Sequence, residues 1–253
     1  MTVAQPRLLR NRPDVRWRYR VHEQILPACL AAGARTLATD VVIRHSGYAS
    51  PGLCVRKQER NLRLLQQERA ENPEDPWVLF QLGKFAAERP DGLEEARGLL
   101  LQAHQLLARG QDPLKRQVHA ALGTTLRRLG LASEAAEVLR EGLSLYPNDA
   151  TLLSESGLLA FESGELAKAE DTFTTLLKGP ADPDELFGAV DLSLRGWQAR
   201  HYLASVHRRQ GRAAEAEAQW RAALSERPDA AVAWLGLCEL YLGQGCGTSS
   251  TRR

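Results

Sequence analysis

Small residues recur in this sequence at a step of 34 residues. Each copy has a glycine or alanine, a glycine seven positions later and an alanine five positions after that. The copies are Gly123, Gly130 and Ala135, then Gly157, Gly164 and Ala169, then, after 13 additional residues, Ala204, Gly211 and Ala216. A step of this length is typical of antiparallel helix pairs stacked in series, because one pair cannot bury its apolar face alone. The repeat therefore predicts an all-α solenoid over most of the chain.

Each recurring position has an expected role in the helix pair. The first lets the two helices approach closely. The second position ends the first helix in a left-handed turn, which glycine adopts without strain. The third lies where the second helix crosses its neighbour, and a large residue fills the space beside it. These large residues are Leu139, Phe173 and Trp220.

The spacing resembles that of tetratricopeptide repeats, which implies a right-handed superhelix. Four repeats and the first helix of a fifth are expected over residues 76–245. Residues 51–75 have helical periodicity and predict one linking helix. We expect residues 246–253 to form a disordered tail, and residues 1–50, which do not repeat, to form a separate segment.

Composition excludes several classes of protein. Apolar residues make up 43% and charged residues 25% of the 253 residues, as in an ordinary globular protein. No apolar run is long enough to span a bilayer, and the first residues lack the apolar core of a secretory signal. We therefore expect a cytoplasmic protein with no membrane partner. Four cysteines without metal-binding spacing are expected to be free thiols, and Cys238 is expected to be buried because it occupies a small-residue position.

Charge is distributed unevenly along the chain. The balance of basic over acidic residues is +8 in residues 1–69 and −6 in the remainder. A basic first segment suggests contact with an anionic partner, whereas an exposed strand face explains the arginines equally well. Trp17 and Tyr19 alternate with arginines, as nucleic-acid stacking surfaces can, but any half-buried strand shows the same alternation. We expect no nucleic-acid partner.

Two strands and a short helix are expected in residues 1–50. Alternating apolar and basic residues predict a strand over residues 15–22, and β-branched residues predict another over 39–48. Residues 24–32 between them predict a short helix that ends at Gly33. Two isolated strands do not form a stable sheet, so this segment has the character of a fragment.

Two motifs in this segment support a second resemblance. The stretches Val-His-Glu-Gln at 21–24 and Ile-Arg-His-Ser-Gly-Tyr at 43–48 are similar to the last part of family-2 glycosyltransferases that carry C-terminal tetratricopeptide repeats. The resemblance covers the whole chain as the C-terminal part of such an enzyme. It implies that residues 1–50 are a short β-containing remnant of a GT-A domain.

The resemblance also implies site residues. His22 occupies the position of a late histidine that joins the metal site, and Glu23 would lie beside the acceptor and phosphate region. A divalent metal and a nucleotide-sugar donor are implied for a complete relative. The acidic metal motif of the family is missing from this sequence, and one histidine does not hold a metal alone. We therefore expect no cofactor and no sugar transfer from this chain by itself.

The first helices of the repeats offer a second candidate site. Their exposed positions are expected to line a concave groove that binds an extended protein segment. The groove residues are Gln117, Arg127, Arg128, Glu155, Gln198, His201, Tyr202, Arg208 and Arg209. The arginines favour an acidic ligand, although arginines near helix carboxyl ends are also explained by the helix dipole.

Two functional hypotheses follow. The first is an interaction scaffold, the accessory arm of a glycosyltransferase-like protein, that docks a partner in the groove. The alternative is the C-terminal part of an active nucleotide-sugar-dependent glycosyltransferase that needs a separate catalytic half.

Overall fold

The computed structural model describes residues 8–35, 37, 51–108, 114–179 and 191–247. The chain divides into two compact units. The N-terminal unit holds residues 5–114, and the C-terminal unit begins at Lys115. The borders predicted at residues 50 and 75 stay predictions. None of the described helices combines the length and apolar character needed to cross a membrane.

The N-terminal unit contains four helices. They are α1 (Leu26–Ala31), α2 (Pro51–Glu71), α3 (Pro76–Ala87) and α4 (Leu93–Leu107). Helix α2 lies within the region for which a linking helix is predicted, and α3 and α4 lie where the first repeat is predicted; both assignments stay predictions. The Asp75 carboxylate caps α3 by accepting hydrogen bonds from the amides of Trp77 and Val78, and Pro76 occupies the first turn.

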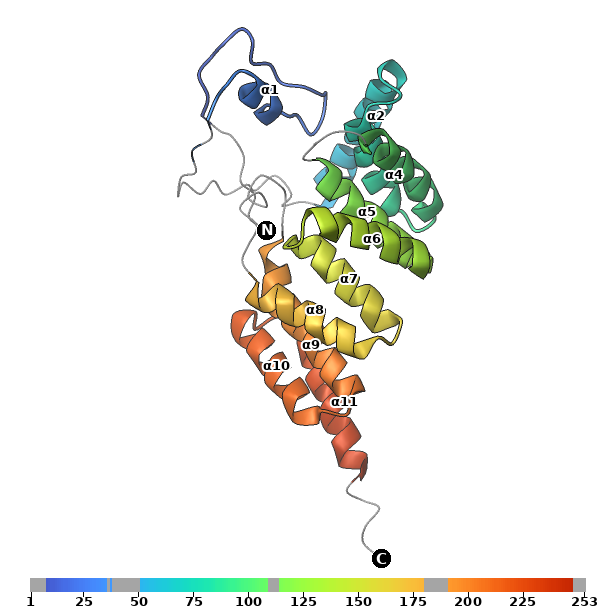
Figure 1. The fold of residues 1–253 in the computed structure, drawn as a ribbon, viewed down its shortest axis with the longest axis vertical. Coiled ribbons are helices and arrows are strands. Elements are labelled where there is room, and N and C mark those ends of the chain that lie inside the picture. The colour runs from blue at the N-terminus through green and yellow to red at the C-terminus, as the bar shows by residue number, and fades with distance from the viewer. Residues whose placement is uncertain (1–7, 36, 38–50, 109–113, 180–190, 248–253) are drawn as a thin grey trace, which may run out of the picture. The chain divides into compact units, whose positions relative to one another are not determined.

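The C-terminal unit is a stack of α-helices (Figure 1). The helices are α5 (Leu114–Arg128), α6 (Ala132–Leu145), α7 (Ala150–Glu162), α8 (Leu166–Lys178), α9 (Trp197–Arg209), α10 (Ala213–Glu226) and α11 (Ala231–Gly247), with a 3₁₀ turn, η2 (Leu192–Arg195), before α9. The pairs α5–α6, α7–α8 and α9–α10 are present, and α11 lies where the first helix of a fifth repeat is predicted. The expectation of an all-α repeat fold is confirmed.

The turn inside each pair follows the predicted chemistry. Gly130, Gly164 and Gly211 have φ of 76°, 80° and 78°. The residue after each glycine donates its amide to a carbonyl five residues earlier, as Leu131 does to Leu126 at 2.9 Å. These bonds satisfy carbonyls that the end of a helix leaves open.

Close packing between paired helices depends on the first recurring position. A Cβ on Gly123 would lie 2.5 Å from Leu139, and one on Gly157 would lie 2.8 Å from Phe173. Phe173 is fully buried among residues of α7, α8 and α9. The close approach predicted at this position is therefore present, and the structure adds that Leu139 and Phe173, predicted beside Ala135 and Ala169, lie against these glycines.

The segment before α2 differs from the prediction. Among residues 8–35 and 37 the only β pairing is a single bridge between Arg18 and Gln24, so the strand predicted over residues 15–22 is not formed. Tyr19 and His22 have φ of 69° and 54°, which an extended strand does not permit. The strand predicted over residues 39–48 and the tail beyond residue 247 lie outside the described residues.

Side-chain contacts explain why this segment folds back instead. The ring of Tyr19 stacks on Trp77 with 5.7 Å between ring centres, and its hydroxyl lies 3.3 Å from the Asp75 carboxylate. Arg20 pairs with Glu68 at 3.1 Å and with Glu71 at 2.6 Å. The acidic end of α2 and the start of α3 therefore neutralise part of the basic first segment.

Gly236 offers a test of the packing rule. A Cβ there would lie 2.3 Å from the buried indole of Trp220, which is rigid, whereas a Cβ on Gly243 of the same helix meets nothing within 4 Å. We expect Gly236→Ala to lower the unfolding free energy by about 1–3 kcal/mol through overpacking. Gly243→Ala should change it by less than about 1 kcal/mol, in the stabilising direction. Urea denaturation followed by circular dichroism measures both, and equal effects would contradict the packing rule.

Candidate functional site

The centre of the predicted groove is an ion-pair network between α5 and α7. Arg127 of α5 donates from Nε to Glu155 at 2.9 Å and from Nη1 to Glu162 at 2.6 Å. The side chains of Arg127 and Glu155 are each 14% exposed. Burial alone would lower the pKa of Arg127, but the two carboxylates raise it above its usual value. Two predicted groove residues thus bind each other, and Glu162 is a partner that the sequence pattern did not indicate.

Tyr202 of α9 adds an aromatic ring to the same face. It stacks on Phe173 of α8 with 5.4 Å between ring centres. Burial and the nearby Glu155 carboxylate raise the pKa of the Tyr202 phenol. The phenol therefore stays neutral and remains a hydrogen-bond donor next to the Arg127–Glu155 pair.

Two further arginines lie at the end of α9. Arg209 is exposed, donates to the Phe161 carbonyl at 2.6 Å and lies over the Phe161 ring at 4.7 Å. Arg208 forms an ion pair with Glu239 of α11 and stays 41% exposed. A guanidinium has five N–H donors in a planar fork, so these exposed arginines retain capacity for a further carboxylate.

His201 and Gln198 have structural contacts on α9. The Trp220 indole donates to His201 Nδ1 at 3.2 Å, which joins α9 to α10 and requires that nitrogen to be unprotonated. Partial burial and the Arg208 charge lower the pKa of His201. Gln198 donates to Asp191 at 3.1 Å, and Asp191 in turn caps η2 by accepting from Ser193. Gln198 thus holds the end of the insert between repeats three and four.

The two remaining groove candidates lie on α5. Gln117 is half-buried and Arg128 is exposed at the end of the helix. The structure thus brings together Arg127, Glu155 and Tyr202 from three successive first helices. Binding at these positions stays a prediction.

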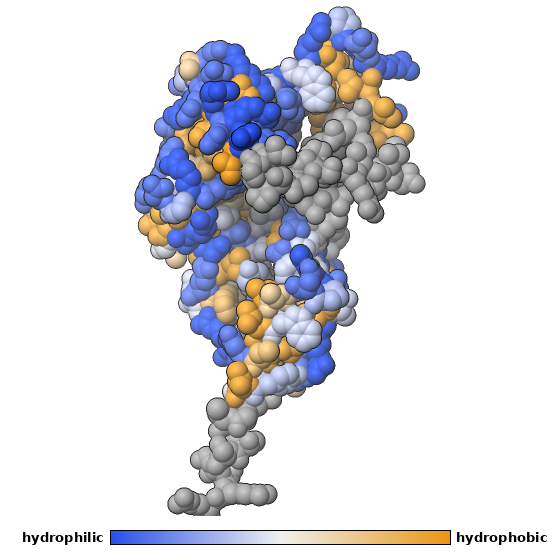
Figure 2. Space-filling model, turned by 180° about the vertical axis from the view of Figure 1, so that it is seen from behind, coloured by the Kyte–Doolittle hydropathy of each residue, from blue (hydrophilic) through white to orange (hydrophobic). Residues whose placement is uncertain are grey.

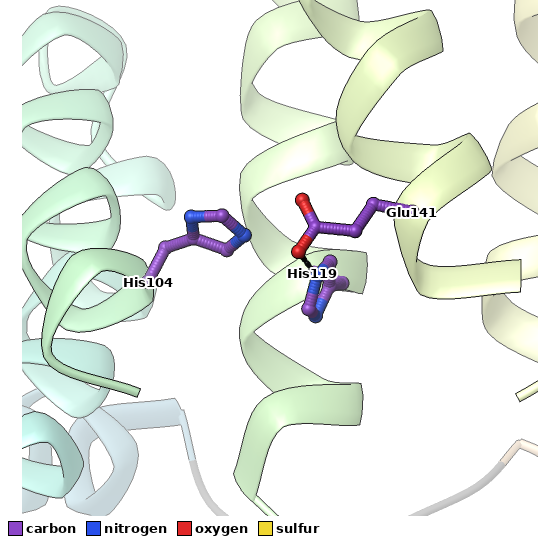
Figure 3. Close-up of side chains that lie close together, drawn as sticks. All are labelled: His104, His119 and Glu141. Carbon is purple, nitrogen blue, oxygen red and sulfur yellow. Dashed lines mark ion pairs between the residues drawn. The ribbon is translucent and has the colours of Figure 1, made fainter. Parts of the chain in front are cut away.

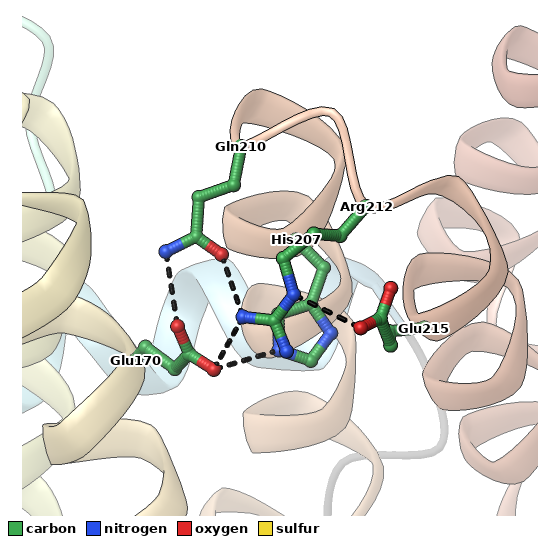
Figure 4. Close-up of polar contacts among 5 residues, drawn as sticks. All are labelled: Glu170, His207, Gln210, Arg212 and Glu215. Carbon is green, nitrogen blue, oxygen red and sulfur yellow. Dashed lines mark hydrogen bonds and ion pairs between the residues drawn. The ribbon is translucent and has the colours of Figure 1, made fainter.

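A second polar cluster joins repeats three and four (Figure 4). Glu170 of α8 accepts hydrogen bonds from Gln210 at 2.9 Å and from Arg212 at 2.7 Å, and it lies 3.3 Å from the buried His207. The bonds from Gln210 and Arg212 lower the pKa of Glu170. Arg212 also donates from Nε to Glu215 at 3.0 Å. Through Glu170, the cluster therefore holds the two neighbouring repeats together.

A histidine also lies inside repeat two. His119 of α5 is buried, donates from Nδ1 to the Lys115 carbonyl at 2.7 Å and lies 3.5 Å from Glu141 of α6 (Figure 3). The pair links the two helices of one repeat. His104, also drawn in Figure 3, belongs to the N-terminal unit.

His22 and Glu23 are both exposed between Val21 and Ile25, which are buried. Loss of hydration and the nearby Lys84 ammonium lower the pKa of His22, while Glu23 acts in the opposite direction. A neighbouring cation opposes the binding of a metal cation. Within the described part of the chain, His22 belongs to no group of three or more candidate metal ligands.

Comparison with known families identifies the repeat. Residues 120–185 and 202–245 match the family described as tetratricopeptide repeat. No curated protein sequence matches the chain. The chain therefore contains tetratricopeptide repeats, as the 34-residue step predicts.

Solved structures agree on the fold. Cut9 with Hcn1, from the APC/C hetero-tetramer, matches with a TM-score of 0.59 and 19% identity over 76% of this chain. That match spans only 35% of the other chain. MamA matches at 0.52 and 16% identity over 75% of this chain and 99% of its own. A tetratricopeptide repeat protein from Parabacteroides merdae matches at 0.52 and 22% identity, over 67% of this chain and 60% of its own. At these identities the likeness shows the fold alone.

The Arg127 network generates a stability prediction. We expect Arg127→Met to lower the unfolding free energy by about 1–3 kcal/mol, because Glu155 loses its partner while it stays largely buried. Lys168→Met removes an exposed pair with Glu165 and should cost less than about 1 kcal/mol. Urea denaturation of both variants gives the comparison. Equal losses would show that the network adds no more than a surface pair.

His201 generates a pH prediction. Its pKa is lowered in the folded chain, so between the ordinary histidine value near 6.5 and the lower folded value only the unfolded chain takes up the proton. Stability from this group is therefore complete above that range and decreases as the pH falls through it. We expect the unfolding free energy of the parent chain to decrease more steeply with acidification than that of His201→Gln. Parallel slopes in urea titrations at several pH values would contradict this.

Proposed function

We propose that this chain is a protein-interaction scaffold that binds an extended polypeptide along the first helices of repeats two to four. The observation that carries the proposal is the contact network that runs from α5 to α9. Charged and aromatic side chains form a band over these helices: Arg127 pairs with Glu155, Tyr202 lies near that pair, and Arg209 contacts Phe161. Such a band offers both hydrogen bonds and stacking surfaces to a backbone laid across it.

The internal ion pairs refine the expected ligand. Arg127 is largely buried with its two carboxylates, so it is poorly placed to attract an acidic side chain from solution. Arg208 and Arg209 are exposed and retain donors. We therefore place the preference for acidic residues at the end of α9, and we assign the Arg127–Glu155 pair to the recognition of polar backbone.

One structural neighbour supports the proposal by analogy of fold. YrrB is described as a tetratricopeptide protein with an unusual peptide-binding site, and it matches this chain with a TM-score of 0.50 and 16% identity over 72% of the chain. The analogy supports a peptide as ligand and leaves open where on the surface it binds.

The link to a glycosyltransferase stays a prediction from sequence. Lys84 beside His22 disfavours a metal at that position. We therefore assign no metal, nucleotide sugar or transfer step to this chain. A cytoplasmic location likewise stays a prediction.

Charge removal at the end of α9 tests the proposal. The probe is a set of fluorescent ten-residue peptides in which glutamate, or lysine in the comparison set, alternates with apolar residues. We expect glutamate peptides to bind the parent chain, and Arg208→Ala with Arg209→Ala to weaken binding about tenfold or more, as loss of a charge-assisted hydrogen bond predicts. Fluorescence anisotropy gives the affinities.

The matched control is Arg140→Ala with Lys168→Ala, which removes two exposed charges from the second helices α6 and α8. This variant should bind like the parent chain. Equal weakening in both variants would show that the effect comes from net charge alone and would contradict a site at the end of α9. Absence of binding by every peptide would overturn the proposal.

A further inference from the structure

Helix α11 is apolar on two opposite sides. One side holds Ala233, Gly236, Leu237 and Leu240, which are buried, in part against Trp220 of α10. The other side exposes large apolar side chains, which form a hydrophobic patch beside the C-terminal residues (Figure 2). Their exposed fractions are 44% for Val232, 53% for Trp234, 61% for Leu235, 42% for Tyr241 and 71% for Leu242. A helix with apolar residues all round is normally buried on all sides.

The position of Cys238 shows which packing partner α11 lacks. It occupies the repeat position of Gly157 and Ala204, where the first helix meets the second helix of its own repeat. The sequence therefore predicted a buried Cys238, but the structure shows it exposed. The prediction was wrong because no described residue supplies a second helix for the fifth repeat. The exposed side of α11 thus has the form of a surface that packs against a helix.

The charge on α11 restricts what can cover this side. Glu239 is the only charged residue of the helix, and it is paired with Arg208. An acidic or basic partner would gain little here, and burying its charges without partners would be costly. The best match is another uncharged apolar helix.

The patch is also symmetric about its centre. Trp234 and Leu235 precede Cys238 by four and three residues, and Tyr241 and Leu242 follow it by three and four. If two such helices pack antiparallel about a twofold axis at Cys238, each large pair meets the other pair of the second copy. The small central side chain lets the helix axes approach closely. A twofold interface requires this kind of self-complementary surface.

Charges at the two ends of the patch fit the same arrangement. Arg227 and Asp229 lie at the Trp234 end, where the indole donates to the Pro228 carbonyl at 2.9 Å. Glu217 and Arg221 lie at the Tyr241 end and both contact its hydroxyl. Each end therefore carries one acid and one base, so antiparallel copies meet without net repulsion.

We propose that the exposed side of α11 is a self-association surface through which two copies of this chain pair antiparallel about Cys238. A patch of a few hundred Å² on each copy buries on the order of 1,000 Å² in total, the lower range for a specific interface. The dimer is therefore weak and depends on chain concentration. This surface adjoins the proposed peptide-binding face, because Arg208 at the end of α9 pairs with Glu239 of α11.

Sedimentation velocity of the full chain tests the association. Between about 1 and 100 µM, a range suited to a small interface, we expect the mass to rise from 28.0 kDa toward twice that value. Leu235→Glu should keep the chain monomeric throughout. Leu145→Glu, which changes an exposed leucine of α6, should dimerise like the parent chain. A parent chain that stays monomeric, or a control that loses the dimer equally, would overturn the proposal.

Cross-linking tests the antiparallel arrangement. In a background in which Cys54, Cys238 and Cys246 are changed to serine and only the buried Cys29 remains, Leu235→Cys and Tyr241→Cys lie three residues on either side of the axis. We expect a mixture of the two chains to form a disulfide-linked heterodimer under mild oxidation, and each chain alone to form little. Preferential 235–235 and 241–241 cross-links would indicate parallel helices, and equal cross-linking of all combinations would indicate random collision. Either result would overturn the arrangement.

Discussion

The close approach of the two helices in each repeat depends on one contact, between a glycine or alanine of the first helix and a large side chain of the second. Gly123 receives Leu139, Gly157 receives Phe173, and Ala204 stands opposite Trp220 in the same register. Each contact brings backbones close enough for dispersion forces to act along both helices. The left-handed glycine turns, the ion pairs between helices, and the band of side chains over the first helices all depend on this close distance between helices.

The repeat fold could be predicted from sequence because its determinants are local and periodic. A glycine at a fixed step indicates both the close approach of the two helices and the turn between them. The segment before α2 could not be predicted in this way. Its alternating pattern suggested a strand, but the contacts of Tyr19 and Arg20 with Asp75, Glu68 and Glu71 determine its path. Those partners lie about 50 residues away and follow no period.

The candidate site, like the fold, could be predicted from the sequence only where its residues follow the repeat. Periodicity placed Arg127, Glu155 and Tyr202 on one face, and the structure brings them together. Periodicity could not show that Arg127 is already bound by Glu155 and Glu162, because pairing depends on side-chain geometry across two repeats. The exposure of Cys238 was missed for a related reason. The repeat position predicts a small residue, and burial there requires a second helix.

The small-and-large contact also has an evolutionary consequence. Tandem arrays gain and lose whole units by recombination, and a contact contained within one unit survives that exchange. Leu139 with Gly123 and Phe173 with Gly157 travel together in this way. Two of the large residues also contact the following unit, since Phe173 stacks on Tyr202 and the indole of Trp220 fits against Gly236. Duplication or loss of a unit therefore keeps each small-and-large pair intact but changes the neighbour that Phe173 or Trp220 meets.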